Sequence, residues 1–184
     1  MTSRHSLTLA LLVLLGCTSQ DKPADAVATT PPPASLAAHA DPSPEISAIR
    51  LQRSGCFGAC PIYEVELAAD GQVKYVGDKF VDQAGFHTSK IHPSEFDALA
   101  DKIRAIHFFS LKDRYRFEPD GCTSWATDQP TATIVVTANG KEKMVAYYYG
   151  CRGLAIGPQL KALAQTIDTV GGTSQWVGGH GGAP

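Results

Sequence analysis

An alternation of apolar and polar side chains on either side of Gly71 constrains the fold more than any other feature of the sequence. Residues 63–67 alternate apolar side chains with glutamates, which is the period of a strand with one buried and one solvent-exposed face, and residues 73–75 continue the alternation. A slip of one residue would turn every side chain to the wrong face. A three-residue turn places Val73 opposite Leu67, so the sequence predicts an antiparallel hairpin with Gly71 in the left-handed conformation.

The segment before this hairpin has the same period, because Ile49 and Leu51 flank Arg50. We expect it to pair antiparallel with residues 63–67, with Leu51 opposite Tyr63. That register sets Arg50 across from a glutamate on the exposed face, which is favourable.

Further along the chain, the sequence predicts two helices and a second hairpin. Proline opens each helix, at His92-Pro93 and at Gly157-Pro158. Apolar residues then recur at helical spacing: Phe96, Leu99, Ala100 and Ile103 in the first helix, and Leu160, Leu163, Ala164, Ile167 and Val170 in the second. Asn139-Gly140 lies between two β-branched or aromatic runs and is typical of a tight hairpin. We therefore predict a single α+β domain, an antiparallel sheet built from hairpins with two amphipathic helices packed on one face, over residues 46–170.

The two ends of the chain differ from this domain in composition. Residues 1–16 contain Arg4 and then a short apolar run ending at Gly16-Cys17, which is typical of a lipoprotein signal peptide with Cys17 as the acylated (palmitate-bearing) residue. Residues 17–45 contain six of the twelve prolines and no aromatic residue, and we expect a disordered tether. Residues 171–184 are rich in glycine, and the sequence predicts a disordered tail.

These features predict where the protein acts. A lipid-bearing Cys17 anchors the chain to a membrane of the bacterial cell envelope. Thr18, where aspartate would resemble an inner-membrane retention signal, favours the outer membrane and a domain facing the periplasm. A formal net charge of −2 provides no basic surface for nucleic acid, so that class of partner is not expected.

The remaining cysteines are even in number and lie in an oxidising compartment, so disulfides are expected. Four cysteines allow three pairings; we favour Cys56 with Cys60 and Cys122 with Cys151, and the crossed pairings stay open. The first bridge would close the loop between two paired strands. The second would join the segment before one strand to the end of its hairpin partner.

The motif around the first pair, Gly55-Cys56-Phe57-Gly58-Ala59-Cys60-Pro61-x-Tyr63, is followed by Asp113-x-Tyr115 and Thr127-Asp128-Gln129-Pro130. Together these motifs resemble the domain-of-unknown-function family numbered 6438, found in small exported bacterial proteins and lipoproteins. The resemblance covers about residues 49–167. It implies a domain and an envelope location, and no activity.

The same Cys-x-x-x-Cys-Pro spacing resembles the copper site of thioredoxin-like copper chaperones, so thiol redox exchange or copper handling by Cys56 and Cys60 is the alternative function. In that fold the cysteines open a helix, whose N-terminus lowers a thiol pKa, whereas here a strand pattern follows Pro61. We therefore favour a structural bridge.

Catalytic and metal-binding signals are weak in this sequence. It contains no hydrolase, phosphate-loop or dinucleotide motif, and its histidines are not spaced as metal ligands, so we expect no enzyme activity, no metal and no cofactor. Large rigid aromatics in loops can form a binding surface, but for Trp125 we favour the interpretation that it anchors its loop on the core. The sequence thus predicts a binding module for an envelope protein, a glycan or a small ligand. Its candidate surface residues are Arg53, Phe57, Tyr63, Trp125 and Asp128.

Overall fold

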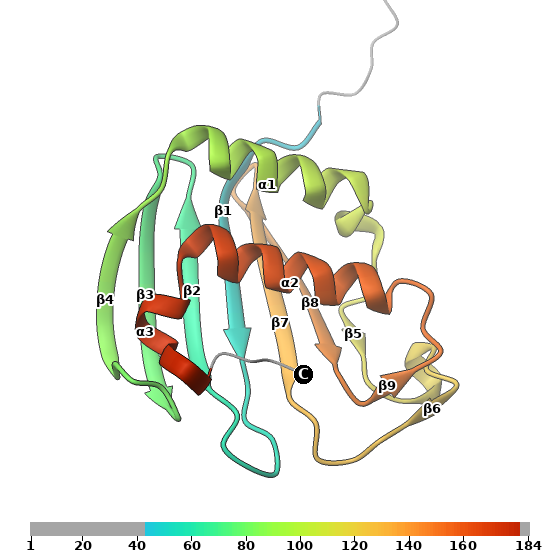
Figure 1. Ribbon diagram of the computed structural model, residues 1–184. Coiled ribbons are helices and arrows are strands. Elements are labelled where there is room, and N and C mark those ends of the chain that lie inside the picture. Colours follow the sequence, from blue (N-terminus) through green and yellow to red (C-terminus); the bar gives the residue numbers. More distant parts are fainter. Residues whose placement is uncertain (1–42, 181–184) are drawn as a thin grey trace, which may run out of the picture. The chain divides into compact units, whose positions relative to one another are not determined.

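The computed structural model describes residues 43–180, which form one α+β domain (Figure 1). Within this range lies a seven-stranded sheet. Its strands, in spatial order, are β4 (Gly85–Lys90), β3 (Gln72–Lys79), β2 (Ile62–Ala68), β1 (Ile46–Arg53), β7 (Thr131–Ala138), β8 (Lys141–Tyr148) and β5 (Arg114–Tyr115). The predicted signal peptide, Cys17 and the tether as far as residue 42 lie outside the described residues.

The remaining elements are short strands and helices. A small antiparallel ladder joins β6 (Ser124–Trp125) to β9 (Cys151–Arg152). The helices are α1 (Pro93–Ala105), α2 (Gly157–Gly171) and α3 (Ser174–Val177), with 3-10 turns η1 (Phe108–Ser110), η2 (Glu118–Asp120) and η3 (Gly178–His180). In Figure 1, α1 and α2 lie in front of the sheet, and α2 contacts β1, β2, β7 and β8. Among residues 43–180, no helix is both long and apolar enough to cross a membrane.

The sheet is antiparallel, as predicted, except at one edge, where β5 runs parallel to β8. The β2–β3 hairpin has the predicted register, with Leu67 opposite Val73, and Gly71 has a φ of +82°. The β7–β8 hairpin turns at Asn139-Gly140, also as predicted.

The predicted pairing of β1 with β2 is wrong by two residues, because Leu51 lies opposite Val65 and Arg50 lies opposite Glu66. A shift of two residues keeps every side chain on its own face, so the alternation of the sequence fits both registers equally well. The ion pair expected across the strands forms in either case, here between Arg50 and Glu66 at 4.0 Å.

Both predicted helices have a proline in their first turn, at the first residue of α1 and the second residue of α2. His92 caps α1: its Nδ1 accepts a hydrogen bond from the backbone N–H of Ser94, and the Glu95 carboxylate accepts one from the backbone N–H of His92. The buried residues of α1 are the four apolar residues of the predicted stripe. In α2, four of the five stripe residues are buried and Val170 is partly buried.

The predicted disordered tail is wrong for residues 171–180, which complete α2 and form α3 and η3. Trp176 is 5% exposed and stacks on Tyr75, with ring centroids 4.7 Å apart. The glycines of this segment make turns: Gly172 ends α2 with a φ of +63°, and the Asp82 carboxylate occupies the position that a Cβ on Gly178 would need. In this segment the glycines therefore allow tight turns and close packing.

Alanine substitutions at two turn glycines are expected to differ in cost. Gly71 and Gly140 both have positive φ, but a Cβ on Gly71 would lie 2.4 Å from the Ile91 carbonyl oxygen, whereas a Cβ on Gly140 meets nothing within 4 Å. Gly140→Ala should lower the free energy of unfolding by about 1–2 kcal/mol through the backbone alone. Gly71→Ala should cost more because the steric clash is added, and urea denaturation of the two variants would measure the difference. Equal losses would contradict the close approach at Gly71.

Candidate functional site

The structure separates the five predicted surface residues into two groups. Arg53 and Tyr63 are buried, with 7% and 9% of their surface exposed, and face α2. Phe57 and Asp128 lie in exposed loops at the end of the sheet where β1 ends and β7 begins, and Trp125 lies in the short exposed strand β6. The first group forms the base of the candidate site and the second forms its surface.

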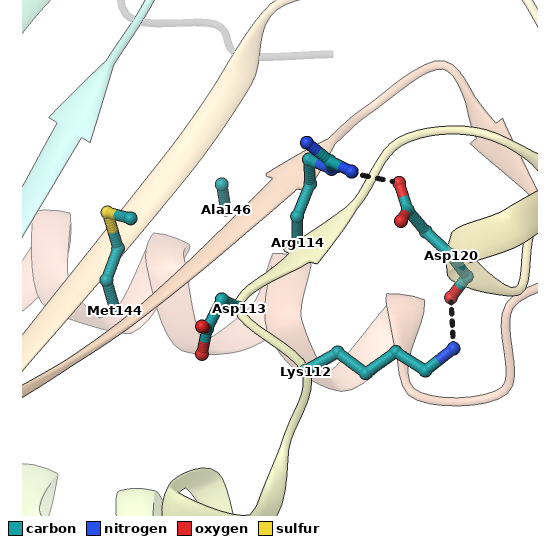
Figure 2. A pocket seen from close by; sticks show the side chains of 6 residues that line it. All are labelled: Lys112, Asp113, Arg114, Asp120, Met144 and Ala146. Carbon is teal, nitrogen blue, oxygen red and sulfur yellow. Dashed lines mark hydrogen bonds and ion pairs between the residues drawn. The ribbon is translucent and has the colours of Figure 1, made fainter.

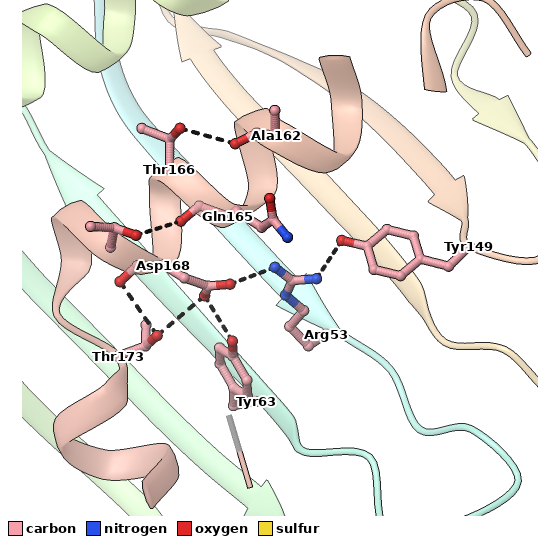
Figure 3. Close-up of polar contacts among 9 residues, drawn as sticks. Arg53, Tyr63, Tyr149, Ala162, Gln165, Thr166, Asp168 and Thr173 are labelled. Atoms are coloured by element: carbon pink, nitrogen blue, oxygen red, sulfur yellow. Dashed lines mark hydrogen bonds and ion pairs between the residues drawn. The ribbon is translucent and has the colours of Figure 1, made fainter. Parts of the chain in front are cut away.

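The base is a network of buried polar side chains around the guanidinium of Arg53 (Figure 3). Arg53 donates from Nη2 to Asp168 Oδ2 and from Nη1 to the Tyr149 hydroxyl, both at 2.5 Å. Tyr63 donates its hydroxyl hydrogen to Asp168 Oδ1 at 2.7 Å, and the Thr173 hydroxyl lies 3.3 Å from the same oxygen. The Asp168 carboxylate therefore connects the end of β1, the start of β2 and the segment after α2. Through its bond to Tyr149, Arg53 also connects the network to the end of β8.

Burial and charge set the ionisation of this network. Burial is the largest single influence on the Arg53 pKa and lowers it, but Asp168, Tyr149 and Tyr63 together outweigh burial and raise the pKa above its ordinary value. Burial, together with the nearby Asp168 charge, raises the pKa of Tyr63. Burial also raises the pKa of Tyr149, although Arg53 acts in the opposite direction. At neutral pH the network thus consists of an ion pair braced by neutral tyrosines.

Sequence reasoning missed Asp168, Tyr149 and Thr173. A signal for Asp168 was present, since it lies four residues after Ala164 and hence on the apolar face of α2. A carboxylate on a buried helix face needs a cationic or hydrogen-bonding partner. Arg53, which continues the inward-facing series Ile49 and Leu51, was the matching signal in β1.

Two tyrosine-to-phenylalanine variants are expected to act in opposite directions. The Tyr75 hydroxyl is buried and has no hydrogen-bond partner among the described residues, so Tyr75→Phe should raise the free energy of unfolding by about 1 kcal/mol at pH 7. Tyr63→Phe removes the hydrogen bond to Asp168 and should lower it by about 1–2 kcal/mol. Urea denaturation of both variants tests this, and a loss of stability in Tyr75→Phe would show that its hydroxyl is satisfied.

Tyr75 should also make the free energy of unfolding fall at alkaline pH. Burial, with a smaller contribution from Asp168, raises the pKa of Tyr75 to about 12, whereas tyrosines of the unfolded chain ionise near pH 10. Above about pH 10 the unfolded state therefore binds fewer protons than the folded state, and stability falls as the pH rises. We expect a shallower decline in Tyr75→Phe than in the unaltered protein when unfolding is measured between pH 9 and about 12.

The surface of the site consists of residues 54–61 and 122–130, which we call the loop end. The Cys56–Cys60 disulfide closes the first loop, as predicted. The backbone N–H of Phe57 donates to the Asp128 carbonyl at 3.1 Å, and Ser54 and Thr131 exchange two hydrogen bonds. The two loops thus hold each other in place, while the side chain of Phe57 is 88% exposed.

The second loop is fixed by the other predicted disulfide, Cys122–Cys151. The β6–β9 ladder places Trp125 opposite Cys151, and the Tyr148 hydroxyl donates to the Ala126 carbonyl at 2.8 Å. Trp125 is 47% exposed and meets the edge of Phe117, with centroids 5.6 Å apart. The favoured interpretation, in which Trp125 anchors its loop on the core, is therefore wrong.

An open pocket of about 400 Å³ lies beside β5 and β8 (Figure 2). It is lined by Lys112, Asp113, Arg114, Asp120, Met144 and Ala146. Its ionic groups are engaged with protein partners: Lys112 with the Asp120 carbonyl, Arg114 with the Asp120 carboxylate, and Asp113 with Lys143. Burial acts against ionisation of Asp120, but hydrogen bonds from the neighbouring backbone and Arg114 lower its pKa. We do not assign the binding function to this pocket, because its charges already have partners.

These observations define a disulfide-bridged α+β domain with exposed aromatic side chains beside its two bridges. The sequence model of a family described as Domain of unknown function (DUF6438) matches residues 47–171. The match covers more than half of the 184 residues, so the chain belongs to this family, as its cysteine motif predicted. No curated protein matches the sequence.

Proposed function

We propose that the protein is a lipid-anchored outer-membrane protein of the bacterial envelope whose domain faces the periplasm and acts as a non-enzymatic binding module. Its partner would be an envelope protein, a glycan or a small ligand, bound at the loop end. The observation that carries this proposal is Phe57, a large apolar side chain that is 88% exposed on a loop closed by a disulfide.

The construction of the loop end supports a binding role. An exposed phenylalanine contributes little to the stability of its own chain, whereas a large aromatic side chain contributes strongly to an interface. The Cys56–Cys60 bridge and the hydrogen bond from Phe57 to Asp128 restrict the loop before any partner arrives, which lowers the entropic cost of binding. Trp125 and Phe117 offer further exposed aromatic surface beside the second bridge.

Site-specific photocrosslinking in living cells tests the binding role. A photoreactive residue is placed at Phe57, at Trp125 and, as a control, at Met144, which is 49% exposed and therefore comparable with Trp125. We expect a discrete adduct from positions 57 and 125 that is absent from position 144 and is reduced when an unlabelled copy of the protein is present in excess. An unlabelled copy carrying Phe57→Ala should compete less well. Identical adducts at all three positions, or none at position 57, would refute the proposal.

The proposed anchor rests on the sequence of residues 1–17 and is tested separately. Labelled palmitate should be incorporated into the protein, and Cys17→Ala should abolish the labelling and release the protein from the membrane fraction. Cys56→Ala with Cys60→Ala, which leaves the motif at residue 17 intact, is the control and should retain the label. Membrane binding with unchanged lipid incorporation in Cys17→Ala would refute the anchor.

The alternative function, redox exchange or copper handling by Cys56 and Cys60, makes a different prediction. Residues 54–61 contain no helix whose N-terminus could stabilise a thiolate, and β2 begins directly after them. A structural bridge should leave no alkylatable thiol at these positions and should have a reduction potential below about −270 mV, the thioredoxin value. A potential near that of periplasmic oxidants, or tight stoichiometric Cu(I) binding by the reduced pair, would instead support the alternative.

A further inference from the structure

The strand β4 forms an open edge of the sheet. It pairs with β3 on one side, and no strand of the described residues 43–180 pairs with its other side. The opposite edge of the sheet, β5, is only two residues long and is followed by the 3-10 turn η2. Of the two edges, β4 is thus the one long enough to accept another strand.

The backbone groups that point out of this edge follow from the register of β3 and β4. Gly71 accepts a hydrogen bond from the backbone N–H of Ile91, and the β3–β4 pairing continues from this bond. In an antiparallel pair, hydrogen-bonded and non-bonded positions alternate, so Ser89 and His87 bond to β3. Phe86, Thr88 and Lys90 therefore direct their N–H and carbonyl groups away from the sheet.

The side chains of β4 leave this edge unprotected. Edge strands are commonly blocked by a central charge, a proline or a bulge. Residues 85–90 contain none of these, and their single charge, Lys90, is the last residue of the strand. Phe86 is 64% exposed and lies opposite the half-exposed Val76, so apolar surface adjoins the unpaired backbone.

We propose that a second copy of this chain pairs antiparallel with β4 through this edge, with the two-fold axis at Thr88. This register pairs all three outward-facing residues, whereas a shift by two residues would leave one of them unpaired. Phe86 then lies opposite Lys90 of the second copy, so an ammonium group meets an aromatic ring and no two charges of like sign face each other. The strand is thus complementary to itself, which argues for a copy of the chain over an unrelated strand.

Sedimentation analysis of the full-length chain carrying Cys17→Ala, which removes the proposed lipid, tests the dimer. We expect twice the mass of a single chain, with dissociation on dilution. Phe86→Lys places an ammonium opposite Lys90 of the second copy and should give the monomer mass. Met144→Lys makes the same change at a half-exposed position on β8 and should leave the dimer intact. A monomer at every concentration, or a dimer insensitive to Phe86→Lys, would overturn the proposal.

A crosslinking experiment tests the register. Two copies of Thr88→Cys would face each other across the axis at about 5.5 Å between Cα atoms, and a short bismaleimide should join them in high yield. Phe86→Cys faces Lys90 of the second copy and should crosslink poorly. Equal yields would refute this register, and the capture of an unrelated protein by Thr88→Cys in place of a second copy would refute the self-pairing.

Discussion

Replacement of Asp168 by alanine is expected to lower the free energy of unfolding by about 3–5 kcal/mol. The Arg53 guanidinium would keep its charge in a buried position, where its side chain is 7% exposed, without the carboxylate that compensates it. Tyr63 would lose its acceptor as well. Thermal and urea denaturation at neutral pH would measure the loss, and a change below about 1 kcal/mol would show that water already compensates the Arg53 charge.

A double variant separates the charge effect from packing. Arg53→Met combined with Asp168→Leu replaces the ion pair with apolar side chains, and such replacements of buried pairs are often neutral or stabilising. We therefore expect the double variant to be more stable than Asp168→Ala alone. A double variant that is less stable than Asp168→Ala would contradict the expected cost of the unpaired Arg53 charge.

Trp176→Ala is expected to cost about 3–5 kcal/mol, which is the range for removal of a buried tryptophan. The ring is 5% exposed and stacks on Tyr75, so its loss would leave a cavity beside β3. Trp125→Ala is the matched control, because that ring is half-exposed and contacts Phe117; it should cost about 1 kcal/mol or less. Comparable losses in the two variants would mean that residues 174–177 do not belong to the core in solution.

Local rules predicted the parts of the fold in which neighbouring residues decide the geometry. The β2–β3 register followed from a turn of fixed length, in which any slip by one residue would bury lysine and glutamate. The β1–β2 register did not follow, because the eight-residue loop 54–61 permits a shift by two that costs no burial. The parallel strand β5 was missed because two residues are too few to show a period.

The base of the candidate site could be predicted less well than its surface. Phe57 and Trp125 were recognisable as aromatic residues in loops, and both are exposed. Arg53 was assigned to the surface, where most arginines lie, but it is buried against Asp168, a partner 115 residues further along the chain. No local pattern can reveal a pair so far apart in the sequence. The pair could have been found only by searching the apolar faces of the predicted elements for a carboxylate that would compensate an inward-facing arginine.

The distance along the chain between Arg53 and Asp168 also determines when the domain can be completed during synthesis. β1 lies in the middle of the sheet, and its second neighbour, β7, follows it in the sequence only after β2 to β6 and α1. Before Asp168 has been synthesised, Arg53 has no carboxylate partner, and burial of its charge is unfavourable. Pairings between such distant segments form slowly. The loops around Cys56 thus acquire their fixed base only after Asp168 has been made.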